Sequence, residues 1–292
     1  MLPDTIHQYL TLFLQKEFPE IKERLTFMPV SGGSINEAFR INARQRKFFL
    51  KYNDARSYPG MFEKEAAGLN LLKSAGEIDI PQVLLTADAG SYSILLLEYV
   101  ESARERPDFW EEFGKKLAAL HGHKSDRFGL DHNNYMGSLY QHNDFHDSWI
   151  EFFIQERLER QVKLARETGR IPRSLVVAME RLYTRLDEIF PETRPSLIHG
   201  DLWSGNFMVN NQGMPCLIDP ATYYGHPEAD IAMTRLFGGF SERFYDAYNA
   251  HSPLEKGSQQ RFEFYNLYPL MVHVNLFGEG YLGSVQQILR KF

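Results

Sequence analysis

The stretch His199-Gly200-Asp201-Leu202-Trp203-Ser204-Gly205-Asn206, followed by Asp219, decides which fold this chain is expected to adopt. An Asp, an Asn five positions later and then a second Asp form the residue order used for in-line phosphoryl transfer. That chemistry needs one carboxylate to accept the proton of the attacking hydroxyl, and two oxygen ligands to hold magnesium against the nucleotide phosphates. We therefore predict that Asp201 is the catalytic base and that Asn206 and Asp219 bind Mg²⁺.

The residues between Asn206 and Asp219 predict how the two ligands meet. Residues 207–209 and 216–218 are apolar, and the polar turn 210–213 between them ends in glycine. Two short apolar runs around a glycine-bearing turn are typical of a β-hairpin. A hairpin would return the chain to its starting point, so Asn206 and Asp219 would lie at the same end.

A second group of residues upstream matches the nucleotide side of such a site. Gly32, Gly33 and Ser34 precede an expected strand, and glycine lets backbone amides approach phosphates without obstruction by a Cβ. An ordinary hairpin turn is the alternative, because the third glycine of the protein-kinase loop is missing.

An apolar strand at 47–51 ends in Lys51, as does the strand that carries the phosphate-binding lysine of kinases. We expect Lys51 to contact the nucleotide phosphates and to pair with a glutamate of the next helix. Glu65 is the candidate, and Glu63 remains an alternative because the helical pattern does not separate them. The order of glycine loop, strand lysine, helix glutamate and catalytic loop supports the interpretation.

The pattern of apolar residues predicts a change of architecture near residue 100. Strands at 83–85 and 93–97 lead to the connector Glu98, Tyr99 and Val100, whose backbone would contact adenine in a kinase-like fold. Helical periodicity then dominates, at 109–120, 149–164 and 175–189. We predict an α+β, protein kinase-like two-lobed fold, with an antiparallel-sheet nucleotide-binding lobe at 1–100 and a mainly helical catalytic and substrate-binding lobe at 101–292.

The composition excludes several other classes of protein. The formal net charge is −6, which argues against an electrostatic nucleic-acid binder. The N-terminus lacks a basic region followed by an apolar one, and no apolar run reaches membrane length. One cysteine, Cys216, precludes a disulfide within the chain, so we expect a cytoplasmic protein without membrane contact.

The segment after Asp219 argues against a protein kinase that is switched by phosphorylation. Only ten residues separate Asp219 from Asp230, which leaves no room for a long activation segment. Gly200 also replaces the arginine that would bind a phosphorylated loop. Asp230 is expected to accept hydrogen bonds from the catalytic-loop backbone, or else to cap the helix that follows it.

Four segments together resemble the fructosamine kinase (ketosamine-3-kinase) family, and the resemblance spans nearly the whole chain. They are HGDLWSGN at 199–206, IDPATYYGHPEADIAMTRLFGGF at 218–240, GGSINEAF at 32–39 and VHVNLFGEGYL at 272–282. HGDxxxxN alone is shared with aminoglycoside and choline kinases, whereas the tryptophan of HGDLW and the DPAxYYGHxExD segment are more specific. Some members carry a cysteine in the glycine loop, where this chain has Ser34, so a thiol switch is not expected.

This resemblance implies ATP and Mg²⁺ as cofactors and the carbon-3 hydroxyl of a ketosamine as the acceptor, either in a free metabolite or on a glycated protein lysine. Trp203 would stack on the sugar, and His226 and Glu228 would bond its hydroxyls or amine. His273 would line the same pocket. The alternative roles are core packing for Trp203 and a backbone-bonded core histidine for His273.

Two other functions remain as alternatives. One is another small-molecule kinase on the same fold, acting on an aminoglycoside, choline or a different sugar. The other is a nucleotide-binding module without catalysis, although a degraded site would usually have lost at least one of Lys51, Asp201, Asn206 and Asp219.

Overall fold

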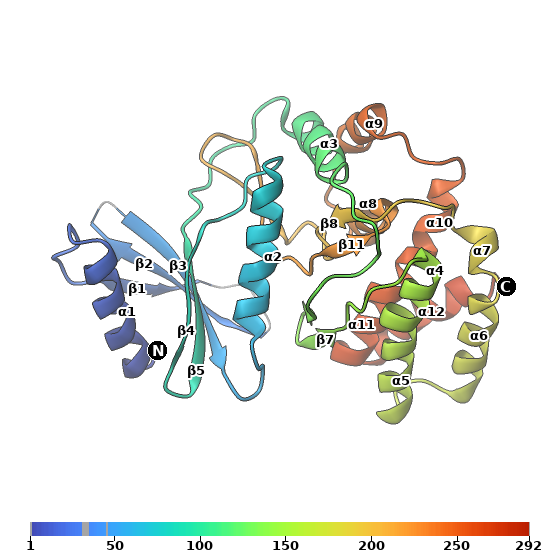
Figure 1. Cartoon of the computed structure of the whole chain (residues 1–292), viewed down its shortest axis with the longest axis horizontal. Helices are drawn as coiled ribbons and strands as arrows, with labels where there is room; N and C mark the ends of the chain where they lie inside the picture. Colours follow the sequence, from blue (N-terminus) through green and yellow to red (C-terminus); the bar gives the residue numbers. More distant parts are fainter. Residues whose placement is uncertain (1, 31–34, 45, 292) are drawn as a thin grey trace.

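A five-stranded antiparallel sheet forms the N-terminal part of the computed structural model, which describes residues 2–30, 35–44 and 46–291 (Figure 1). The strand order is β1-β2-β3-β5-β4. The strands are β1 (Thr26–Pro29), β2 (Glu37–Ala43), β3 (Arg46–Asp54), β4 (Val83–Ala89) and β5 (Tyr92–Glu98). Strand β3 pairs with β2 on one side and β5 on the other, so Lys51 lies on a central strand.

Two helices cover opposite faces of this sheet, α1 (Asp4–Glu17) and α2 (Met61–Ala75) (Figure 1). Successive side chains of a strand point to opposite faces. Accordingly, Leu96 of β5 belongs to the core beneath α1, whereas Leu95 and Leu97 belong to the core that includes α2. This second core continues into the C-terminal part of the molecule, so α2 is held from both sides.

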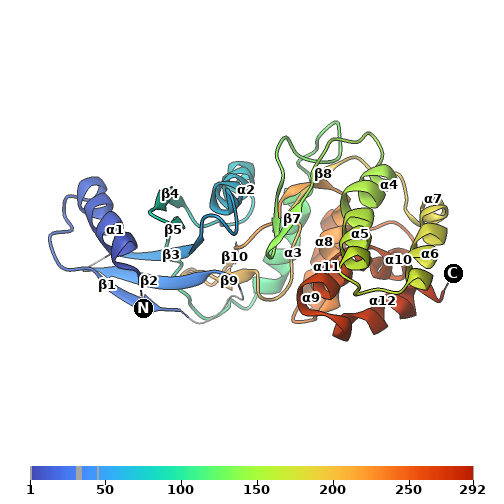
Figure 2. The same ribbon diagram turned by 90° about the horizontal axis from the view of Figure 1, so that it is seen from below.

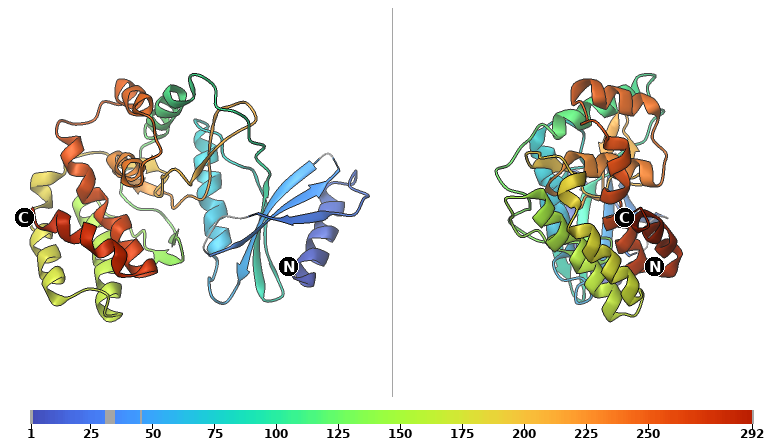
Figure 3. Two further views of the ribbon diagram at one scale, coloured as in Figure 1. Left: turned by 180° about the vertical axis from the view of Figure 1, so that it is seen from behind. Right: turned by 90° about the vertical axis from the view of Figure 1, so that its right-hand side faces the viewer.

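The C-terminal part is mainly helical and lies at the other end of the molecule from α1 (Figure 2). Its first helices are α3 (Phe109–Leu120), α4 (Trp149–Phe152), the π-helix η1 (Phe153–Leu158), α5 (Glu159–Glu167), α6 (Arg173–Tyr183) and α7 (Leu186–Ile189). The later ones are α8 (Pro227–Leu236), α9 (Glu242–His251), α10 (Ser258–Tyr265), α11 (Leu267–Phe277), the 3₁₀-helix η2 (Glu279–Tyr281) and α12 (Leu282–Leu289). The C-terminus follows α12, at the end remote from the sheet (Figure 3).

Short antiparallel strand pairs interrupt these helices. They are β6 (Asn134–Met136) with β7 (Leu139–Gln141), β8 (Ser196–Ile198) with β11 (Tyr223–Gly225), and β9 (Phe207–Val209) with β10 (Pro215–Leu217). The β9–β10 pair confirms the predicted hairpin between Asn206 and Asp219. A parallel bridge between Asp79 and Cys216 attaches this hairpin to the chain segment that follows α2.

The observed fold confirms the predicted class, a small antiparallel sheet followed by a mainly helical part. One helix prediction is wrong: the expected helix at 175–189 is divided into α6 and α7, because Arg185 takes a φ of −130°, outside the helical region. The β6–β7 hairpin was not anticipated. The division at residue 100 stays a prediction, although 99–108 contains neither helix nor strand. Within the described ranges, no helix is long and apolar enough to cross a lipid bilayer.

Candidate active site

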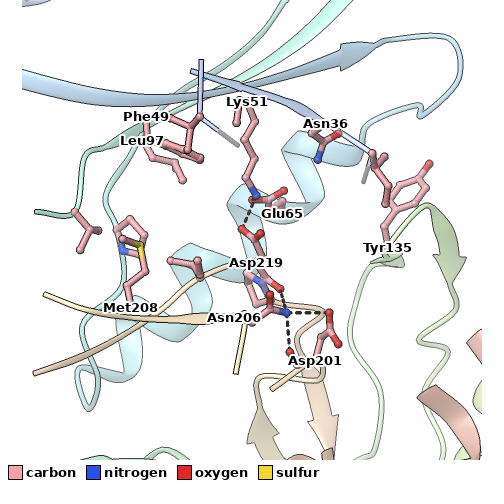
Figure 4. Close-up of a pocket in the computed structure, with 18 of the residues that line it drawn as sticks. Asn36, Phe49, Lys51, Glu65, Leu97, Tyr135, Asp201, Asn206, Met208 and Asp219 are labelled. Carbon is pink, nitrogen blue, oxygen red and sulfur yellow. Dashed lines mark hydrogen bonds and ion pairs between the residues drawn. The ribbon is translucent and has the colours of Figure 1, made fainter. Parts of the chain in front are cut away.

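A cleft of about 580 Å³ lies between the sheet and the helical part (Figure 4). Strand β3, helix α2, the connector after β5, the catalytic loop and the β9–β10 hairpin all contribute to its walls. The predicted site residues that line it are Lys51, Glu65, Glu98, Tyr99, Val100, Asp201, Trp203, Asn206 and Asp219. The predicted Gly32, Gly33 and Ser34 lie outside the described residues, whereas Val30 and Ile35 on either side of them line the cleft.

The catalytic loop places Asp201 and Asn206 side by side. The Asn206 Nδ2 donates to the Asp201 backbone oxygen at 2.8 Å and to its Oδ2 at 2.9 Å. Gly200 makes the turn possible: its φ is +82°, and a Cβ there would lie 2.1 Å from the Ala221 carbonyl oxygen. The loop therefore requires glycine where protein kinases carry arginine.

A buried acid holds the backbone of this loop from behind. Asp230 accepts hydrogen bonds from the backbone nitrogens of His199 at 2.7 Å and Gly200 at 2.9 Å, which confirms its predicted structural role. His121 Nε2 lies 3.2 Å from the same carboxylate, and its Nδ1 lies 2.7 Å from the Tyr248 hydroxyl. Burial alone would raise the pKa of Asp230, but the bonds from His121 and the loop lower it, so Asp230 stays ionised.

Lys51 bridges two carboxylates at the centre of the cleft. Its Nζ lies 2.7 Å from Glu65 Oε1 and 2.5 Å from Asp219 Oδ1. Glu65 is therefore the helix partner, and Glu63 is exposed to solvent instead. Burial lowers the pKa of Lys51, but the two carboxylates outweigh it and raise the net value, so the ammonium stays charged.

Asp219 follows the hairpin in a backbone conformation that few residues adopt. Its φ is +55°, in the left-handed region, where Asp occurs more often than most side chains. The Ile218 nitrogen donates to the Asn206 carbonyl oxygen at 3.0 Å, which joins the end of the hairpin to the catalytic loop. Asn206 and Asp219 therefore lie at the same end of the hairpin, as the sequence predicted.

The environment of Asp201 makes this carboxyl group more basic than an ordinary aspartate. Burial raises its pKa, and the nearby charges of Asp219 and Asp230 raise it further, whereas the hydrogen bond from Asn206 lowers it. The net result is a pKa well above its usual range. Such a shift is common at sites of proton transfer, because a stronger base accepts a hydroxyl proton more readily.

Apolar residues that were not predicted cover the other half of the cleft. The sheet contributes Ala38, Phe49 and Leu97, and the residue after β1 contributes Val30. The β9–β10 hairpin contributes Met208, and the residue after the hairpin is Ile218 (Figure 4). A signal for Phe49 was present, because it lies two positions before Lys51 and therefore faces the same side of β3. These side chains form apolar walls next to the connector.

Trp203 lines the cleft two residues after Asp201 and is 38% exposed. Its ring folds over Gly205, where a Cβ would lie 2.3 Å from the indole. His273 on α11 is half-buried and does not line the cleft, which corrects the prediction for this residue. Its Nδ1 donates to the Pro269 carbonyl oxygen at 2.7 Å, as the alternative of a backbone-bonded histidine predicts. Phe237 connects the two, because its ring centroid lies 6.2 Å from that of Trp203 and 5.1 Å from that of His273.

The structure does not place His226 and Glu228 where a substrate could contact them, and this corrects the prediction for both. Their exposed fractions are 3% and 2%. Glu228 forms a bidentate ion pair with Arg261, at 2.5 and 2.9 Å. His226 caps α8 by accepting from the Glu228 nitrogen, and burial lowers its pKa to about 3. Both side chains therefore have structural roles.

Two amide side chains support the segment after Asp219, and sequence reasoning missed them. Asn134 Nδ2 donates to the Thr222 carbonyl at 2.8 Å, and Gln141 Nε2 donates to the Ala221 carbonyl at 3.0 Å. Gln141 in turn accepts from the Tyr268 hydroxyl at 2.7 Å. All of these partners are far apart in sequence, so no local pattern pointed to them.

Comparisons with known proteins agree with this geometry. The family model for fructosamine kinase matches residues 5–292. A Synechocystis protein named as a probable ketoamine kinase is 40% identical over 289 residues, covering 98% of this chain and 95% of its own. The chloroplastic protein-ribulosamine 3-kinase of Arabidopsis thaliana is 36% identical, covering 89% of this chain and 80% of its own.

The solved structures include a similar protein from Haemophilus somnus, assigned as a fructosamine-3-kinase. It superposes with a TM-score of 0.85 at 30% identity and covers 97% of this chain and 96% of its own. The family model thus matches almost every residue, and the relatives are similar over nearly the whole of this chain. The chain belongs to the fructosamine kinase family.

Proposed function

We propose that this protein is an ATP-dependent kinase that phosphorylates a sugar hydroxyl of a ketosamine, the one on carbon 3. The observation that carries the proposal is the arrangement of Asp201, Asn206, Asp219 and Lys51 around one cleft. Membership of the fructosamine kinase family supports a ketosamine as the acceptor, since relatives are named for ketoamine and ribulosamine substrates.

ATP would bind with adenine between the apolar walls and against the connector 98–100. The phosphates would then extend toward Lys51, whose retained positive charge suits them. Glu65 keeps the lysine pointing into the cleft, since its carboxylate lies 2.7 Å from Lys51 Nζ.

The donor set beside Lys51 fits a magnesium ion. Mg²⁺ prefers oxygen ligands, and the Asp219 side chain is 45% exposed, compared with 12% for Glu65. Asn206 directs its Nδ2 to Asp201, which leaves its amide oxygen available for a metal. Bound there, Mg²⁺ would neutralise charge on the phosphates. We therefore assign Asn206 and Asp219 as its ligands.

Asp201 would accept the proton of the attacking hydroxyl. Asn206 orients the carboxylate, and Asp230 fixes the loop that carries it. Trp203 offers an exposed ring face on which the sugar can stack. His273 lies outside the cleft, next to Phe237. It donates from Nδ1 to the Pro269 carbonyl, and burial lowers its pKa, so a neutral ring keeps a lone pair on Nε2 for a polar group of a substrate that extends out of the cleft.

The 3-phosphate of a ketosamine is expected to break down and release the amine. The reaction would thus remove sugar from glycated amines, both free metabolites and lysine side chains of proteins. A deglycating repair role follows from this chemistry.

A substrate panel tests the proposal. ADP release would be measured with ATP and Mg²⁺ on fructosamines, ribulosamines, an aminoglycoside and choline. We expect turnover on at least one ketosamine and none on the aminoglycoside or choline. Preference for either of the latter would replace the proposal with a different small-molecule kinase. ATP binding by calorimetry without turnover on any compound would indicate a non-catalytic module.

A further inference from the structure

An exposed row of aromatic rings leads away from the cleft. Three members are large apolar side chains open to solvent: Trp203 is 38% exposed, Phe237 41% and Phe277 57%. His273 and Tyr281 complete the row. The ring centroids of His273 lie 5.4 Å from Phe277 and 4.8 Å from Tyr281, and Phe237 links His273 to Trp203. We call these five residues the aromatic strip.

The strip is built from segments that are distant in sequence. Trp203 belongs to the catalytic loop, and Phe237 follows the last residue of α8. His273 and Phe277 are four positions apart on α11, so they share one face of that helix, and Tyr281 lies in η2. Isolated exposed aromatics are ordinary, but a contiguous row of rings in which three large apolar side chains are exposed is less common and is typical of a binding surface.

The strip begins inside the cleft, because Trp203 is one of its lining residues. Lys51 and the connector form the nucleotide half of this cleft. A sugar bound at Asp201 would therefore have the nucleotide on one side. Any substituent of that sugar would have to extend out of the cleft on a different side. The strip continues directly from Trp203, because the ring centroid of Phe237 lies 6.2 Å from that of Trp203 and both rings are exposed.

We infer that the aromatic strip binds the substituent on the amine nitrogen of the ketosamine, an apolar chain or ring, and thereby selects which glycated amines are accepted. The inference rests on the proposed function. In a ketosamine the amine is attached to carbon 1, two carbons from the hydroxyl at carbon 3. With that hydroxyl at Asp201 and the sugar on Trp203, the substituent extends beyond the sugar, toward Phe237 and Phe277.

The chemistry of the strip suits such a substituent. Aromatic faces bury alkyl and aryl groups and also tolerate a neighbouring ammonium, because the ring face carries partial negative charge. His273 would not repel a protonated amine, since its burial favours the neutral ring. The methylene stem of a glycated lysine has this same combination of an apolar chain next to a cationic nitrogen.

The test uses three ketosamines of one sugar, made from ammonia, butylamine and benzylamine. In the unmodified enzyme we expect kcat/KM to be roughly 10-fold higher for the butyl and benzyl compounds than for the unsubstituted one, mainly through KM. Phe237→Ala and Phe277→Ala should each bring this ratio closer to one. Phe145→Ala is the matched control, because Phe145 is 40% exposed and does not line the cleft.

Three outcomes would overturn the inference. The unmodified enzyme could show no preference for a substituted amine. The two variants could leave the ratio unchanged or lower kcat/KM for all three compounds equally. Phe145→Ala could change the ratio as much as they do. Failure of the proposed function is distinguishable, because the unmodified enzyme would then turn over none of the ketosamines. Thermal unfolding of each variant verifies folding, and Phe277→Ala is the decisive one because its ring is the most exposed.

Discussion

Replacement of Asp201 by asparagine separates the chemistry of the site from its architecture. The substitution keeps size and shape, and the new side chain still offers an oxygen to Asn206 Nδ2, which now lies 2.9 Å from Asp201 Oδ2. The backbone contact of Asn206 at 2.8 Å is unaffected. The substitution removes the negative charge and with it the capacity to accept a proton, but it touches none of the residues proposed to contact ATP, so ATP binding should be retained.

The magnitude of the expected loss follows from this single change. A positioned general base contributes about 10²- to 10⁴-fold to the rate. We therefore expect Asp201→Asn to lower kcat by about 10²- to 10⁴-fold or more. The Kd for ATP should stay within about twofold of the value for the unmodified enzyme. For the unmodified enzyme, the raised pKa of Asp201 should place the acidic limb of the pH–kcat/KM profile above pH ~4, the value of an ordinary aspartate.

The same raised pKa makes a prediction about stability. A carboxyl whose pKa is higher in the folded than in the unfolded protein binds its proton more tightly when folded. Its contribution to the free energy of unfolding is therefore favourable at low pH, and is lost as the pH rises from the unfolded toward the folded pKa. Above its folded-state pKa the ionised group opposes folding, and below that pKa the protonated group is neutral, as asparagine is, so Asp201→Asn should leave Tm unchanged or raise it.

The assays are ADP release for kcat, calorimetry for ATP binding, and thermal unfolding without ligands. Asp246→Asn, an exposed residue of α9, is the matched control and should change none of these quantities. The reasoning would be refuted by an Asp201→Asn enzyme that keeps a tenth or more of the activity. A lowered Tm together with the loss would equally contradict the argument from burial.

Three further predictions concern residues around the site. Glu65→Gln should raise KM for ATP by roughly 10-fold, since a hydrogen bond to a charged group contributes about 1.5–3 kcal/mol. An unchanged KM would mean that the ion pair with Glu65 does not position Lys51. Glu228→Gln should lower the free energy of unfolding by about 3 kcal/mol in denaturant titrations, because it leaves the charge of Arg261 buried without its carboxylate partner. KM for the ketosamine should stay the same. A raised KM in a stable variant would restore Glu228 to the substrate site. Gln141→Ala should lower kcat about 10-fold and leave KM for ATP unchanged, since it removes the hydrogen bond to the Ala221 carbonyl in the segment after Asp219. Equal effects on kcat and on KM for ATP would instead indicate that the whole site has lost its structure.

The sequence by itself determined the parts of the site that depend on nearby residues. The spacing from Asp201 to Asn206 is that of one tight loop, and Asn206 and Asp219 are brought together by a single hairpin whose turn residues are visible in the chain. Lys51 was found in the same way, from the apolar residues that precede it, although strand β3 continues past Lys51 to Asp54. Such features are local, because the conformation of a loop or hairpin depends mostly on the few residues that form it.

Only the tertiary structure decided which of several similar side chains reach the cleft. Glu63 and Glu65 are both glutamates of α2, and the direction in which that helix packs on the sheet turns Glu65 toward Lys51. Glu228 looked available in sequence, but Arg261, 33 residues away, neutralises it in the core. The physical reason is the same in each case: burial and ion pairing depend on contacts between distant segments, and these contacts are set by packing of the whole chain.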